Sequence, residues 1–272
     1  MGEAHLEGAN MSEVEDRKLD EAEFHDQRER DRNAMSDEDF LAKYPNKRFY
    51  RYAKAHIDRM DEFIALYAPD ADALDFCCGL GAMSLAMAEA GATVTGIDIS
   101  SDSVSTAAAR LKAAGLGDRS TFAVMDAEAL EFPNDSFDVI ICSGVLHHLD
   151  VNRAYPELAR VLRPGGRILA AEALGYNPFI NAYRKLTPKL RTEWEADHIL
   201  TNRELKIAEK YFDTVEVEYF YLLSIAGLVL PESAFGDAVR KITAAADALL
   251  LKVPGVKLMA WQMLFQLSAP KS

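Results

Sequence analysis

Apolar residues recur in the first quarter of the chain at the spacing of amphipathic helices. Between residues 20 and 68, large apolar side chains return every three or four positions among charged ones, which is the helical period. Pro45 interrupts the pattern, so we predict two helices, and Pro69 ends the second because the residue before a proline disfavours helical angles. Residues 1–20 are polar and acidic without any period, so we predict a disordered leader there.

From residue 71 onward, short apolar runs alternate with helical stretches, and glycines separate them. This alternation is typical of βαβ units, which build a parallel sheet. The predicted strands lie at about 73–76, 93–98, 121–125, 137–143 and 167–171. The predicted helices lie at about 81–90, 101–114 and 152–162. Ligands of such sheets bind at the carboxyl ends of the strands, so candidate chemistry is sought there.

Past Glu172 the alternation becomes less regular. Residues 176–200 contain Pro and Arg and are followed by a predicted helix at 202–211 and a strand at 214–220, with a last strand at 259–268. Between these two strands lie about 36 residues, 221–256, that are rich in Leu, Ile, Val and Ala, where a hairpin needs only a handful. We interpret them as a helical insertion that roofs a pocket, forms a dimer face or rests on a membrane surface.

Composition excludes several classes of protein. The 272 residues carry a net charge of −13, and 14 of the 43 acidic residues lie within residues 1–40. Nucleic-acid recognition needs clustered Lys and Arg, so we expect no nucleic-acid partner. The three cysteines, Cys77, Cys78 and Cys142, have no disulfide or metal-ligand spacing. No secretory signal and no run of 18 apolar residues is present, so we expect a cytoplasmic protein without a metal or a transmembrane segment.

The most informative run reads ALDFCCGLGA and begins at Ala73, where a strand gives way to a helix. Gly79 and Gly81 let backbone approach a ligand closely, and the following helix offers unpaired N–H groups. A lone Gly-x-Gly is a weak signal, and a plain tight turn remains an alternative.

Acidic residues follow the next two predicted strands. Asp98 ends the second, 23 positions after Asp75, where a carboxylate accepts hydrogen bonds from both hydroxyls of a ribose. Asp126 follows the third, where a carboxylate can accept from an adenine amino group. Local turns or a helix N-terminus are the alternative roles of these acids. The fourth strand ends at Ser143 and leads into Leu-His-His-Leu, which contains His147 and His148.

These motifs resemble those of the class I S-adenosylmethionine-dependent methyltransferases, in particular the small-molecule branch with the ubiquinone and menaquinone biosynthesis enzymes. The resemblance covers about residues 75–174 and includes the Arg-Val-Leu-Arg-Pro-Gly-Gly run that ends at Gly166. This chain departs from the family at Cys77, where the family usually has glycine, so backbone approach there is less free. A nicotinamide-binding protein is a weaker alternative, because Ser84 stands where its fingerprint needs a third small residue.

The resemblance implies how the cofactor is held. Residues 75–81 would cradle its methionine end, with Asp75, Cys77, Gly79 and Gly81 as the contacts. Asp98 would bind the ribose with Ile99 beside it, and Asp126 and Ala127 would hold the adenine. The Ser143 backbone would contact the methionine amino group.

Residues near the expected methyl group are the candidates for acceptor chemistry. His147 or His148 can take a proton from the acceptor, since histidine titrates near neutral pH, but the pair can equally serve packing. Arg184 and Arg191 can hold an acceptor carboxylate or phosphate, with ordinary ion pairs as the alternative, and Trp194 lies in the same cluster. His25 on the first helix is a further candidate, although a solvated helix face explains it as well.

We therefore predict an α/β fold with a Rossmann-like, seven-stranded, mostly parallel sheet and an antiparallel last strand. Residues 1–20 form the leader, 21–70 an N-terminal helical lid, and 71–272 the main domain. Its cofactor half is 71–174, its substrate side 176–200 and its insertion 221–256. The predicted activity is methyl transfer from S-adenosylmethionine to a small, hydrophobic or amphipathic acceptor, with peripheral membrane contact and a homodimer left open. A cofactor-binding subunit without catalysis is the alternative, because fold does not fix function.

Overall fold

The computed structural model of the chain describes residues 11–46, 53–192, 194–195, 198–230 and 233–271. Its centre is one seven-stranded sheet with the order β3-β2-β1-β4-β5-β7-β6. The strands are β1 (Asp72–Phe76), β2 (Thr93–Asp98), β3 (Ser120–Val124), β4 (Phe137–Ser143), β5 (Leu162–Ala173), β6 (Phe212–Phe220) and β7 (Gln262–Pro270). Strands β1 to β5 pair in parallel, whereas β7 runs antiparallel to both β5 and β6. The predicted fold class is confirmed.

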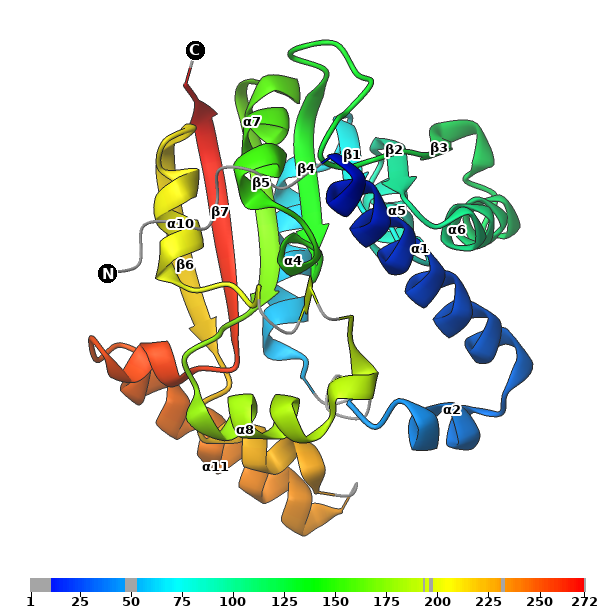
Figure 1. The fold of residues 1–272 in the computed structure, drawn as a ribbon. Coiled ribbons are helices and arrows are strands. Elements are labelled where there is room, and N and C mark those ends of the chain that lie inside the picture. Colours follow the sequence, from blue (N-terminus) through cyan, green and yellow to red (C-terminus); the bar gives the residue numbers. More distant parts are fainter. Residues whose placement is uncertain (1–10, 47–52, 193, 196–197, 231–232, 272) are drawn as a thin grey trace.

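Helices cover both faces of the sheet (Figure 1). The long helices are α1 (Met11–Ala34), α2 (Asp37–Lys43), α4 (Ala55–Tyr67), α5 (Ala82–Glu89), α6 (Ser101–Ala113), α7 (Val151–Val161), α8 (Pro178–Leu186), α10 (Asn202–Ala208) and α11 (Ala234–Leu250). Single 3-10 turns are η1 (Gly117–Arg119), η2 (Leu146–His148), η3 (Pro188–Leu190), η4 (Ser224–Val229) and η5 (Val256–Met259). No helix in the part of the chain that the structure describes is long and apolar enough to cross a bilayer.

Two hydrophobic clusters bind these layers to the sheet. Helices α7 and α10 pack on one face, where Tyr155 and Leu158 contact side chains such as Phe76 and Phe265. Helices α4, α5 and α6 pack on the other face through residues such as Met60. Alternate residues of a strand point to opposite faces, and burial on both sides explains why the central strands are continuous apolar runs.

The N-terminal region differs from the prediction. Residues 11–20 are not a disordered leader but the first part of helix α1, while residues 1–10 lie outside the described part of the chain. The first break falls at Ser36, which caps α2 by accepting a hydrogen bond from Asp39 N–H, and not only at Pro45. The prediction failed because α1 is charged on most of its surface, which makes its apolar period weak. Contacts with the main domain stabilise this helix instead.

Helix α1 lies across the carboxyl edge of the sheet, beside α6 (Figure 1). Arg30 donates to Asp102 of α6 at 3.0 Å, and the Ser100 hydroxyl donates to Asp26. The predicted insertion is present as η4, α11 and η5 between β6 and β7. Both segments therefore frame the edge at which ligands of open α/β sheets bind.

Candidate functional site

A cavity of about 890 Å³ opens at the carboxyl ends of β1, β2, β4 and β5. The chain leaves β1 toward β2 on one side, and β4 lies on the other side of β1. Loops part at this reversal of strand order and leave a crevice between them. The volume is in the range of pockets for drug-sized ligands and cofactors.

The loop after β1 forms the first wall of the cavity. Cys77, Gly79 and Gly81 have φ angles of +61°, +48° and +72°, which glycine adopts freely and cysteine does not. A Cβ on Gly81 would lie 2.9 Å from the Cβ of Ala107, so a side chain there collides with α6. A Cβ on Gly79 would have no atom within 4 Å, so that position faces open space.

Asp75 stabilises this turn from below. Its Oδ2 accepts hydrogen bonds from Ser84 N–H at 2.8 Å and from the Ser84 hydroxyl at 2.6 Å, within the first turn of α5. Burial raises the pKa of Asp75 to about 6, against the lowering effect of these hydrogen bonds. The residue lines the cavity, but one of its oxygens is committed to holding the helix start.

Asp98 stands at the end of β2 with its carboxylate fixed by backbone. Gly79 N–H donates to Oδ2 and Ser100 N–H donates to Oδ1, both at 2.9 Å. The side chain is 8% exposed and lines the cavity with its neighbour Ile99. Each oxygen accepts one of these backbone hydrogen bonds and can accept one more. The two oxygens together can therefore accept hydrogen bonds from two hydroxyl groups of one ligand.

Asp126 and Ala127 line the next part of the cavity, and Ser143 lines it from the end of β4. Asp126 Oδ1 accepts from Glu128 N–H at 2.9 Å, and Lys18 of α1 donates to Oδ2. Arg17 of the same helix donates to the buried Glu128 at 2.6 Å. The supposed leader thus reaches the predicted adenine side of the cavity with two cations.

His147 forms a tight pair with Glu172, the penultimate residue of β5. Its Nδ1 lies 2.6 Å from Glu172 Oε2, while Val145 N–H and Leu146 N–H donate to Oε1 at 2.8 and 2.7 Å. Burial lowers the pKa of His147, but the Glu172 carboxylate outweighs it and holds that pKa above its ordinary value. Glu172 is 2% exposed, so this histidine has a fixed orientation.

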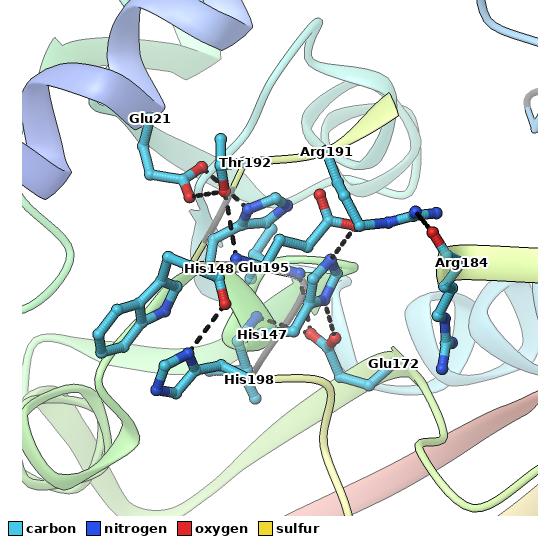
Figure 2. Close-up of polar contacts among 12 residues, drawn as sticks. Glu21, His147, His148, Glu172, Arg184, Arg191, Thr192, Glu195 and His198 are labelled. Carbon is cyan, nitrogen blue, oxygen red and sulfur yellow. Dashed lines mark hydrogen bonds and ion pairs between the residues drawn. The ribbon is translucent and has the colours of Figure 1, made fainter. Parts of the chain in front are cut away.

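His148 makes the corresponding contact with Glu21 of α1. Its Nδ1 lies 3.0 Å from Glu21 Oε2, and the Thr192 hydroxyl donates to the other oxygen of Glu21. Burial and the neighbouring His147 lower the pKa of His148 to about 3. Burial opposes ionisation of Glu21, yet the adjacent His148 and His25 hold its pKa well below the usual range. Figure 2 shows the two labelled histidines side by side with their carboxylates on different segments.

Donor atoms in this cluster also approach the spacing of metal ligands. Glu21, His25 and His148 form one such set, and His147, His148 and Glu195 another, each with atoms within 4.8 Å of one another. Arg28 donates to His25 Nδ1 at 2.7 Å. A neutral His25 then carries its proton on Nε2, the nitrogen that faces Glu21 at 3.6 Å, and has no lone pair there for a metal. The first set is therefore built for sharing protons.

The predicted acceptor-binding residues differ in their placement. Arg191 lines the cavity but donates to the carbonyls of Arg184 and Thr187 at 2.8 and 2.9 Å, which closes the end of α8. Arg184 lines the cavity and donates to Asn181 at 2.9 Å. Trp194 is not among the cavity-lining residues. Its ring stacks on His198 with centroids 3.5 Å apart, and the Arg17 guanidinium lies 4.3 Å from its centre.

His25 is brought into the site rather than left on a solvated helix face. It lines the cavity, and its ring centroid lies 5.0 Å from that of His148. The insertion contributes as a roof, since Leu222, Leu223 and Ile225 line the same cavity. Asp247 of α11 holds this stretch by accepting from Leu222 N–H and Leu223 N–H at 3.0 and 2.7 Å.

Three carboxylates of the site were missed by the sequence analysis. Glu172 had a usable signal, because it directly follows the strand predicted at 167–171, at the ligand-binding edge. Glu21 had only its i, i+4 spacing to His25, which is common on charged helices. Glu128 follows Asp126 by two positions and resembles a surface acid, yet its side chain is fully buried among Arg17, Lys18 and Arg153.

Comparisons with known proteins agree with this geometry. Residues 74–170 match the family profile described as a methyltransferase domain. The 27-O-demethylrifamycin SV methyltransferase of Amycolatopsis mediterranei is 40% identical over 119 residues, 43% of this chain and 43% of that protein. The ubiquinone/menaquinone biosynthesis C-methyltransferase UbiE of Geotalea daltonii is 34% identical over 110 residues, 39% of this chain and 47% of that protein.

These matches span less than half the length of each relative. Among solved structures, the PH0226 protein from Pyrococcus horikoshii superposes with a TM-score of 0.52 at 20% identity, over 80% of this chain and 91% of that one. At this identity the superposition shows a shared fold. The family profile spans β1 to β5 and so includes the glycine-rich wall, Asp98 and Asp126.

Proposed function

Residues 74–170 are a methyltransferase domain of the class I, S-adenosylmethionine-dependent family, and from this premise we propose that the chain methylates a small acceptor. The methyl donor is S-adenosylmethionine, and the acceptor is hydrophobic or amphipathic. Methyl transfer of this kind needs a donor site and an acceptor site that share one water-poor chamber. The cavity of about 890 Å³ at the switch point of the sheet supplies such a chamber.

The observation that carries the proposal is the fixed carboxylate of Asp98 opposite the open Gly79. Each Asp98 oxygen is oriented by one backbone N–H and has room for a ribose hydroxyl. No atom lies within 4 Å of the place where a Cβ of Gly79 would be, so a ligand can contact the protein backbone there. The residues present therefore fit a nucleoside with a charged amino-acid tail.

The chain's own residues divide the binding task. Asp98 and Ile99 hold the ribose side, and Asp126 with Ala127 holds the base, where Lys18 must share or release the Asp126 carboxylate. The amino-acid side is lined by Asp75, Cys77, Gly79 and Ser143, while Gly81 shapes the turn without lining the cavity. When bound, S-adenosylmethionine supplies an electrophilic methyl carbon on a sulfonium.

The histidine pair handles the acceptor proton. The two pKa values shift in opposite directions. Burial and His147 lower the pKa of His148 to about 3, which leaves a neutral ring with a lone pair, whereas Glu172 outweighs burial and raises the pKa of His147. For an acceptor with an O–H or N–H bond, the carbon–sulfur bond of the bound donor would break with its electron pair left on sulfur as the acceptor atom gains the methyl group. His148 would take the proton that the acceptor atom then loses. His147 orients the acceptor from the other side.

The acceptor side of the cavity favours an apolar molecule with one polar group. Its walls include Phe179, Leu223, Ile225 and Trp261, and the polar groups converge at the histidines and Arg184. Arg184 is the residue of this wall suited to an acceptor carboxylate or phosphate. Arg191 and Trp194 shape the segment that carries it.

Isothermal titration calorimetry with S-adenosylmethionine and S-adenosylhomocysteine tests the donor site. We expect binding, and we expect Asp98→Asn to weaken it by about tenfold or more, in line with a lost charge-assisted hydrogen bond. Asp102→Asn on the neighbouring helix is the matched control, because Asp102 is half-exposed and pairs with Arg30.

Transfer from labelled S-adenosylmethionine to candidate apolar acceptors tests the reaction. His148→Ala is expected to reduce turnover by about 10² or more, the usual contribution of a positioned base, with unchanged donor affinity. Retention of the donor without transfer to any acceptor in a cell extract would instead identify a binding subunit. Absence of donor binding would overturn the proposal as a whole.

A further inference from the structure

The two neighbouring histidines are each backed by a carboxylate, and the two carboxylates come from different parts of the fold. Glu172 belongs to β5 and contacts His147 Nδ1, whereas Glu21 belongs to α1 and contacts His148 Nδ1. The rings lie 4.2 Å apart between centroids, and Figure 2 shows them in this arrangement. One pair is built into the sheet, while the other exists only where α1 is docked.

Burial and two side-chain contacts fix the position of Glu21. It is 6% exposed, the Thr192 hydroxyl donates to its Oε1, and His25 Nε2 faces its Oε2 at 3.6 Å. One turn earlier, Arg17 and Lys18 attach the helix to Glu128 and Asp126. The same helix therefore touches the donor side of the cavity and the acceptor-side histidine.

The contact with Glu21 decides where His148 carries its proton. An ionised carboxylate only accepts hydrogen bonds, so the neighbouring Nδ1 must be the protonated nitrogen of a neutral His148. Nε2 is then the atom with the lone pair. A buried carboxylate on Nδ1 also stabilises the imidazolium that forms after proton uptake, as in carboxylate–histidine pairs of hydrolases.

The contact is close but not yet aligned. Glu21 Oε2 and His148 Nδ1 are 3.0 Å apart, and both atoms are buried without a hydrogen bond of acceptable angle. In ligand-free sites such contacts are often misaligned and tighten when the reactants bind. Two unpaired buried atoms facing each other are costly, which favours a small rotation into a hydrogen bond on binding.

We propose that Glu21 is a positioning residue that sets the proton-accepting state of His148, so that docking of α1 completes the acceptor site. Proton uptake by His148 Nε2 is then efficient only when α1 covers the cavity and water is excluded. This role rests on the proposed methyl transfer for its kinetic consequence, but the state of His148 can be measured without turnover.

The kinetic test compares Glu21→Gln with Glu23→Gln in the full chain. Glu23 lies two positions along the same helix and is exposed, so its replacement controls for loss of charge on α1. We expect Glu21→Gln to lower kcat by about 100-fold, with the donor Kd within threefold of wild type, and Glu21→Asp to recover part of the loss. Equal kcat values for the Gln variants at positions 21 and 23 would refute the positioning role.

Nitrogen-15 spectra of histidine-labelled protein give a second readout that needs no acceptor. The chain has six histidines, and His148→Asn assigns the signal of His148 by its disappearance. We expect the Nδ1–H tautomer of His148 in the wild type and in Glu23→Gln, and its loss in Glu21→Leu, which has no acceptor atom. An unchanged tautomer in Glu21→Leu would overturn the proposal even if methyl transfer is found.

If no methyl transfer is found with any acceptor, the spectra still decide the role of Glu21. A metal ion bound at one equivalent per chain and lost in Glu21→Gln, measured by mass spectrometry of the purified protein, would also overturn the proposal. Glu21 would then be a ligand, not a partner of His148. Circular dichroism of each variant checks that the helical content is retained.

Discussion

At the residue scale, the site depends on side chains held in unusual states. Cys77 has a left-handed backbone with a φ of +61°, which costs a residue with a Cβ roughly 1–2 kcal/mol. The family usually has glycine at this position, so we expect a ligand to approach the backbone less freely here. Cys77 adds a Cβ at a backbone angle that glycine adopts without cost. His56 is a second residue in an unusual state, because its imidazole is buried. It contacts Tyr221 and lines the same cavity.

His56 makes the stability of the protein dependent on pH. Its backbone N–H donates to the Tyr221 hydroxyl at 3.2 Å, and that hydroxyl lies 2.9 Å from its Nδ1, so the hydroxyl proton points at a neutral ring. Burial lowers the pKa of His56 from 6.5 to about 4, although Asp58 opposes the shift. The unfolded chain therefore binds the proton more readily between these two values.

The stability contributed by neutral His56 is complete above about pH 6.5 and is lost as pH falls toward 4. Linkage sets the loss at up to about 3 kcal/mol. His56→Gln, which does not titrate, should show a flatter dependence, measured by urea unfolding from pH 7.5 to 4.5. A constant difference in unfolding free energy between the two proteins across that range would contradict this expectation.

At the element scale, helices outside the sheet supply the walls that the sheet lacks. Helix α1 lines one side of the cavity, and residues 222–225 of the insertion, which contact α11, line another. Asp247 of α11 is 5% exposed and accepts from the Ser224 hydroxyl and from three successive backbone N–H groups, those of residues 222–224. Arg240 of the same helix donates to the carbonyls of Gly227 and Leu230 at 3.2 and 3.1 Å, so α11 holds the roof through these two side chains.

Asp247→Asn should loosen the roof. An amide offers one acceptor oxygen where four donors converge, so we expect a loss of about 1–3 kcal/mol in unfolding free energy. The acceptor KM should rise while the donor Kd stays unchanged. Asp213→Asn is the matched control, because Asp213 is exposed and pairs with Lys271 at 3.5 Å away from the insertion, and surface pairs contribute little. Equal effects of the two substitutions on KM would exclude this role of the roof.

At the scale of the whole molecule, segments that are far apart in the sequence enclose one cavity. The sheet edge, α1, α8 with the residues after it, and the insertion all contribute lining residues, so a ligand that fills the cavity links them. A homodimer and a peripheral membrane contact stay open. One side of α11 presents three apolar side chains that are each about 70% exposed, those of Phe235, Ile242 and Leu249. A dimer contact or a membrane contact would be tested first at this surface.

Donor binding should therefore stabilise the entire fold. At a concentration 100 times the Kd, S-adenosylhomocysteine adds about 2.7 kcal/mol, which raises Tm by roughly 5 °C for a chain of this size. Amide exchange should slow in both α1 and residues 222–225. Slower exchange in the sheet loops alone would show that α1 and the insertion do not enclose the ligand.

Local patterns in the sequence determined the sheet and its ligand-binding edge. Strands at 93–98 and 137–143 were predicted at their observed bounds, since apolar runs between glycines are set by local geometry and burial. The glycine loop and Asp98 followed from the same order of elements, because the carboxyl ends of parallel strands meet. These features depend on residues that lie near one another along the chain.

Only the tertiary structure decided what completes the site. Glu21 and His148 are separated by 127 positions, and Arg17 and Glu128 by 111, and no local pattern records such pairs. A helix that is charged on most of its surface has a weak apolar period. The sequence pattern therefore predicts disorder for residues 11–20, although they are helical. Docking against the cavity gave that helix its structure, because its cations and Glu21 find partners only on the folded domain.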